Sequence, residues 1–80
     1  MRFTRKQATD LANSLDQGAD DKTEAASSGD AHAANPANST LSRKQAKASA
    51  RILRGQARDM RADADAIRDG VNPTELGYTP

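Results

Sequence analysis

Apolar side chains follow a regular helical period in the second half of the chain. From residue 46 to residue 71 they recur at alternating steps of four and three residues without a gap. This spacing puts them on one face of a helix and forms a heptad seam of the kind that packs against another helix. We call this set the seam; it consists of Ala46, Ala50, Leu53, Ala57, Met60, Ala64, Ile67 and Val71. Alanine forms one side of the seam, so we expect a second helix to approach closely there.

A shorter helical pattern occupies residues 1–17. Thr4 suits an N-cap and Gln7 lies three residues later, which is the spacing of a capping box. The apolar positions 8, 11, 12 and 15 share one face, and Gly18 suits a C-terminal cap. The stretch "FTRKQA" at 3–8 returns almost unchanged as "LSRKQA" at 41–46. We interpret this repeat as one capped helix start used twice, with Ser42 as the second N-cap.

Between these patterns lies a segment, residues 18–40, without a single large apolar side chain. It consists mainly of Ala, Ser, Asp, Gly and Asn. Such a composition offers little area to bury and is typical of flexible linkers. The sequence therefore predicts four segments: a short helix at 1–17, a disordered or extended linker at 18–40, a long amphipathic helix at 41–69 and a docking tail at 70–80.

The tail begins at Gly70, which suits the end of the long helix, and residues 72–75 resemble a second capped start of about one helical turn. Leu76 and Tyr78 then follow close to the end of the sequence. We expect these two side chains to act as anchors for a pocket on another protein. The alternative is that they fold back on the long helix near Ile67.

Basic side chains form a second line along the long helix, beside the seam. We call this set the basic stripe; it consists of Lys44, Lys47, Arg51, Arg54, Arg58 and Arg61. Like charges at these spacings repel one another, and the helix dipole disfavours cations in the first turn. Charge placement therefore works against the isolated helix, and a helix selected only for stability would not carry this arrangement.

Three interpretations of the basic stripe remain open: a solvated face, a contact with an acidic protein surface, and a contact with a nucleic-acid backbone. The stripe has no aromatic residue for stacking on single strands, and the acidic residues of the linker would repel phosphate. Nucleic acid is therefore the less favoured partner.

Composition limits how much core the chain can build. Only 35% of the 80 residues are hydrophobic, most of these are alanine, and there is no cysteine for a disulfide. Burial of the few large side chains falls short of the entropy lost on ordering the whole chain. We expect a mostly α fold with little independent core, completed by self-association or by a larger protein assembly that packs on the seam.

Residues that carry chemistry are scarce. His32 stands alone in the predicted linker, and no phosphate loop, metal-ligand spacing or nucleophile–base pair is present. The sequence therefore predicts no enzyme, no cofactor and no metal site. No apolar run reaches the roughly 18 residues that span a bilayer, and no signal peptide is evident, so we expect a cytoplasmic or virion location.

These features lead to one functional hypothesis and one alternative. The hypothesis is a non-enzymatic accessory subunit that lies on a larger assembly, such as a phage capsid, tail or cement component. Richness in Ala, Arg and Asp, typical of GC-rich bacterial and phage genomes, agrees with that setting. The alternative is a small nucleic-acid-binding or regulatory protein that uses the basic stripe.

Overall fold

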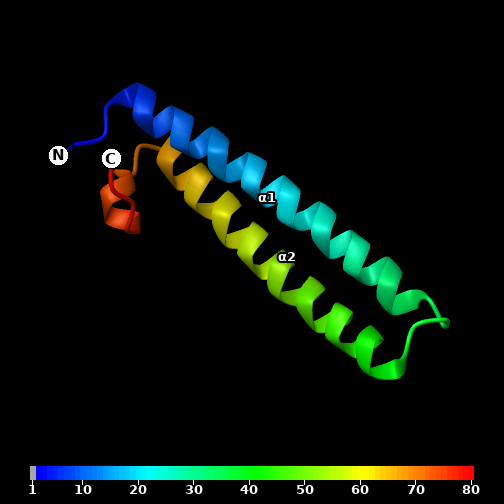
Figure 1. The fold of residues 1–80 in the computed structure, drawn as a ribbon. Coiled ribbons are helices and arrows are strands. Elements are labelled where there is room, and N and C mark those ends of the chain that lie inside the picture. The colour runs from blue at the N-terminus through cyan, green and yellow to red at the C-terminus, as the bar shows by residue number, and fades with distance from the viewer. Residues whose placement is uncertain (1) are drawn as a thin grey trace.

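Two long helices lie side by side and antiparallel in the computed structural model, which describes residues 2–80 (Figure 1). Helix α1 spans Arg5–Ala34 and helix α2 spans Thr40–Arg68. A short 3₁₀ helix, η1, spans Pro73–Leu76 and lies with the tail at the open end of the hairpin (Figure 1). The principal extents of 51 × 17 × 16 Å are those of a rod. The expectation of a mostly α fold is confirmed.

The predicted linker at 18–40 is corrected by the structure, because α1 continues without a break through residues 18–34. The connection between the helices is only residues 35–39. Alanine is the best helix former, and four alanines of α1 recur at every seventh residue: Ala12, Ala19, Ala26 and Ala33. The first three are completely buried, and the fourth is half-buried. Small side chains thus form the buried face of this helix.

Alanines also line the facing side of α2, where Ala50, Ala57 and Ala64 are almost completely buried. Gly29 shows how near the two backbones come, because a Cβ atom built there would lie 3.1 Å from the carbonyl oxygen of Ala46. Each alanine buries little area, but the repeated small residues let the helices pack closely along much of their length. The hairpin is therefore held by an alanine interface rather than by a cluster of large side chains.

The start of α1 agrees with the prediction, whereas the start of α2 and the role of Gly18 differ from it. The capping box of Thr4 and Gln7 is confirmed. The Gln7 backbone N–H donates a hydrogen bond of 3.1 Å to the Thr4 hydroxyl oxygen, and the Thr4 backbone N–H donates one of 2.9 Å to Gln7 Oε1. The second N-cap is Ser39, whose hydroxyl oxygen accepts a hydrogen bond from the backbone N–H of Ser42 at 3.1 Å. Gly18 lies inside α1 instead of ending it, beside the tip of Met60. The repeat at 41–46 is therefore not a second helix start, since α2 begins before it.

Larger apolar side chains gather at the open end of the hairpin. Leu15 and Ile67 are each 7% exposed and pack with Ala12 and Ala64. The chain turns away from α2 at Gly70, whose φ of 104° is the left-handed conformation that glycine adopts readily. The following residues form the predicted helical turn as η1, capped by Asn72. The tail is thereby directed back onto the two helices.

Candidate anion-binding face of helix α2

The seam faces α1 of the same chain. Four of its members, Ala50, Ala57, Ala64 and Ile67, are buried, and the other four are half-buried. The predicted approach of a second helix thus occurs within the chain, since α1 extends far enough to cover the long seam. Binding of another protein to the seam would require the hairpin to open.

The basic stripe divides into two rows once α1 is in place. One row, at every seventh residue, lies next to α1 and consists of Lys47, Arg54 and Arg61, continued by Arg68. The other row, Lys44, Arg51 and Arg58, is displaced by three residues and points further from α1. We call these the inner row and the outer row. Within residues 2–80, every member of the inner row except Lys47 forms an ion pair, and no member of the outer row does.

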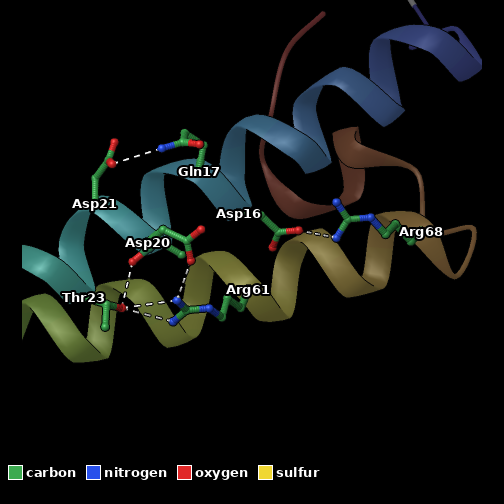
Figure 2. A network of polar contacts seen from close by, with 8 residues as sticks. Asp16, Gln17, Asp20, Asp21, Thr23, Arg61 and Arg68 are labelled. Carbon is green, nitrogen blue, oxygen red and sulfur yellow. Dashed lines mark hydrogen bonds and ion pairs between the residues drawn. The ribbon is translucent and has the colours of Figure 1, made fainter.

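Acidic side chains of α1 pair with three members of the inner row. Arg61 forms an ion pair of 3.0 Å with Asp20 and also reaches Thr23 at 3.3 Å (Figure 2). Arg68 forms an ion pair of 2.6 Å with Asp16 (Figure 2). These are solvent-exposed pairs, each worth about 0–1 kcal/mol, so they fix the alignment of the helices more than they stabilise them.

The third pair, Arg54 with Asp30, lies nearer the loop. The hydrogen bond from Arg54, helped by the charges of Arg54 and Lys47, outweighs desolvation and lowers the pKa of Asp30. The same hydrogen bond raises the pKa of Arg54. Both groups therefore stay charged, and the pair persists across the neutral pH range.

Sequence reasoning missed these acidic partners because most of them fall in the segment read as a linker. A signal was present: residues 16, 20, 23 and 30 are separated by four, three and seven residues, which places them on one side of a helix. This finding also removes an argument against an anionic partner. Two of the linker carboxylates expected to repel it, Asp20 and Asp30, are already paired with arginines.

The outer row and Lys47 form no ion pair among the described residues, although Lys47 is near enough to Asp30 for its charge to help lower the pKa of that carboxyl. None of Lys44, Lys47, Arg51 and Arg58 forms an ion pair with another residue in the part of the chain that the structure describes. All four are exposed. Together they form a cationic face along residues 44–58 of α2, and we call it the basic face.

The basic face is hollowed at two places. A hollow of about 310 Å³ is lined by Asp30, Lys47, Arg51, Arg54, Gly55 and Arg58. A second one of about 220 Å³ lies nearer the loop and is lined by Ala33, Thr40, Arg43, Lys44 and Lys47. Lys47 belongs to both. The face thus offers recesses in which an anionic group can be reached by several cations at once.

The tail anchors pack on the chain's own core. Leu76 and Tyr78 are half-buried against the cluster that contains Leu15 and Ile67, as the fold-back alternative describes. The Tyr78 hydroxyl donates a hydrogen bond of 2.7 Å to the Asp63 carboxylate. Partial burial, together with this hydrogen bond and the nearby charge of Asp63, raises the pKa of Tyr78 to about 12.

This raised pKa gives a testable pH dependence of stability. Because the ordinary value is 10.0, folding favours the protonated phenol. The contribution is therefore present in full below pH 10 and is lost as the pH rises toward 12. We expect the difference in free energy of unfolding between the natural chain and Tyr78→Phe to shrink from pH 8 to pH 11.5, as measured by urea titration. An equal difference at both pH values would contradict the Tyr78–Asp63 bond, since lysine titration affects both chains alike.

Three further features of residues 2–80 bear on what the chain can bind: a hollow at the open end, the placement of metal-ligating side chains and the apolar character of the helices. A further hollow of about 620 Å³ at the open end is lined by apolar residues including Phe3, Ile67 and Val71, with Arg5 and Arg68 beside them. No three His, Asp or Glu side chains gather as a metal site among residues 2–80. Within the same residues, no helix combines the length and the apolar character needed to cross a membrane.

Comparisons of the chain with protein-family models, with curated proteins and with solved structures found no match.

Proposed function

We propose that the chain is a non-enzymatic interaction protein, an accessory subunit that docks its basic face on an acidic surface of a larger protein assembly. A phage virion is one assembly of this kind. The observation that carries the proposal is a set of four cations that form no ion pair with any described residue and lie together on one helix of the hairpin. A chain that needed only to be stable would gain by pairing them.

The hairpin suits docking because its seam is already covered. Packing of α1 on α2 leaves the cationic side chains on the outside, so a partner can be bound without opening the core. Charges at the edge of an interface act mainly on the rate of association and on specificity. Binding is therefore expected to be fast and to weaken as the salt concentration rises.

Nucleic acid is the second candidate, and one observation favours it. Lys44 and Arg58 are fourteen positions apart, so the outer row spans roughly 21 Å of helix, enough to follow several phosphates of a backbone. The face has no aromatic side chain and few groups able to read bases. Such binding would be non-specific in sequence.

The experiment compares the natural chain with two variants of equal charge loss. One carries Lys44→Gln, Arg51→Gln and Arg58→Gln; the control carries Arg2→Gln, Arg5→Gln and Lys22→Gln, away from the basic face. Glutamine retains helix propensity, so both should fold. The partners are the purified assembly that co-purifies with the chain from its source cells and a random-sequence DNA duplex, each titrated across a salt series.

We expect the outer-row variant to bind the assembly about tenfold or more weakly, because each exposed charge contributes up to about 1 kcal/mol. The control variant should bind within about twofold of the natural chain. Tight binding of the duplex instead would establish the second candidate. Equal binding of the assembly by all three chains would overturn the proposal that the basic face is the docking surface.

A further inference from the structure

We propose that the hollow of about 310 Å³ beside Gly55, which we call the recess, is a binding site for a phosphate dianion. This group is carried by a phosphorylated side chain or by free phosphate. The inference rests on the proposed function, because it names the anionic group that the docking partner would place on the basic face. Its evidence is the shape and the charge of one recess.

The recess is open because residue 55 has no side chain. A Cβ atom built on Gly55 would meet only one atom, Nη2 of Arg58, at 3.9 Å. Glycine costs an exposed helix interior about 1 kcal/mol relative to alanine, and the left-handed conformations that justify glycine elsewhere are not used here. Space for a ligand is one physical reason for glycine at this position. Arg51 and Arg58 lie on one row at either side of it.

The charges of the recess favour a compact dianion. Four cations and one carboxylate line it, and the carboxylate, Asp30, is already bound by Arg54. Three cations therefore remain: Lys47, Arg51 and Arg58. A carboxylate or a phosphodiester brings one negative charge, whereas a phosphomonoester brings nearly two and three acceptor oxygens. The guanidinium groups match those oxygens geometrically, and Lys47 adds a point charge.

The negative charge of Asp30 opposes the binding of an anion in the recess, so replacing Asp30 should change the affinity for phosphate. Its carboxylate repels any anion in the recess, but its bond to Arg54 holds that side chain at the recess wall. Replacement by the isosteric amide, Asp30→Asn, removes the repulsion and releases the charge of Arg54. The variant should therefore bind the dianion more tightly than the natural chain does.

The test is a titration of the ¹⁵N-labelled full chain followed by amide chemical shifts at constant ionic strength and pH 8. The probes are methyl phosphate, a monoester dianion at that pH; dimethyl phosphate, a diester monoanion; and chloride as the background. We expect saturable shifts at Gly55 and its neighbours with methyl phosphate, and affinity at least about fivefold lower for dimethyl phosphate. Equal response to both esters would overturn the dianion site and indicate a surface suited to nucleic acid.

Variants separate the recess from general positive charge. Gly55→Leu fills the recess without a charge change and should abolish saturation, whereas Gly55→Ala, a better helix former, serves as the folded control and should retain it. Arg51→Gln should weaken binding about fivefold, and Asp30→Asn should strengthen it. Unchanged binding in Gly55→Leu, with the helical spectrum intact, would refute the site.

The two proposals fail in different ways. If the outer-row variant no longer binds the assembly and methyl phosphate gives no saturable amide shifts, the docking proposal is supported and the phosphate site is refuted. If methyl phosphate saturates and the Gly55→Leu variant binds the assembly as tightly as the natural chain does, the recess takes free phosphate and not a group of the partner.

Discussion

Replacing Ala26 with leucine is expected to remove about 2–3 kcal/mol of the free energy of unfolding, because the larger side chain must force the two helices apart. Ala26 is completely buried against α2, in a segment where small residues set the helix separation. An 80-residue chain has roughly 4–12 kcal/mol of stability in total. The loss is measured by urea unfolding followed through the helical circular dichroism signal.

The neighbouring position gives a matched control. Ala25 is exposed on the same helix, so Ala25→Leu should change the free energy of unfolding by less than about 0.5 kcal/mol. If residues 18–40 were flexible, both substitutions would have the same effect on the free energy of unfolding. Equal stability of the two variants would therefore contradict the packing of this part of α1.

Replacing Leu15 with alanine is expected to cost about 2–5 kcal/mol, since it removes one of the few large side chains of the core and leaves a cavity. Leu15 is 7% exposed and joins α1 to Ile67 at the open end of the hairpin. The tail packs on the same cluster through Leu76 and Tyr78, so its contacts should loosen as well. Urea unfolding measures the first effect, and amide exchange of residues 74–78 measures the second.

Leu41→Ala is the matched control for this prediction. Leu41 is 67% exposed at the loop end of α2, and its truncation should shift the free energy of unfolding by at most about 0.5 kcal/mol. A loss at Leu41 as large as that at Leu15 would mean that the core lies elsewhere.

The second half of the fold could be predicted from the sequence, and the reason is the size of its seam residues. Leu53, Met60 and Ile67 mark the buried face of α2 clearly, and Gly70 marks its end. The same heptad spacing exists in α1 as Ala12, Ala19, Ala26 and Ala33. Alanine occurs on both buried and exposed faces. Among the many polar residues of this segment, its heptad spacing therefore did not distinguish a packed helix from a flexible linker.

The candidate site was predicted in part. The basic stripe follows directly from residue spacing, but which of its members pair with acidic side chains depends on where α1 lies. Asp20 and Asp30 become partners of Arg61 and Arg54 only across the helix interface, with more than twenty intervening residues. The packing of Leu76 and Tyr78 also needed the tertiary structure, because two apolar residues in a short tail fit either a partner or the chain's own core.

The covered seam and the ion pairs of the inner row both require that residues 18–34 form a helix packed on α2. Amide hydrogen exchange of the isolated chain tests this directly. We expect the amide of Ala26 and its neighbours in α1 to be protected to nearly the same degree as those around Ala57 in α2, with both regions exchanging through global unfolding. Exchange at the rate of an unstructured peptide throughout residues 18–34, with α2 alone protected, would contradict the hairpin and the basic face built on it.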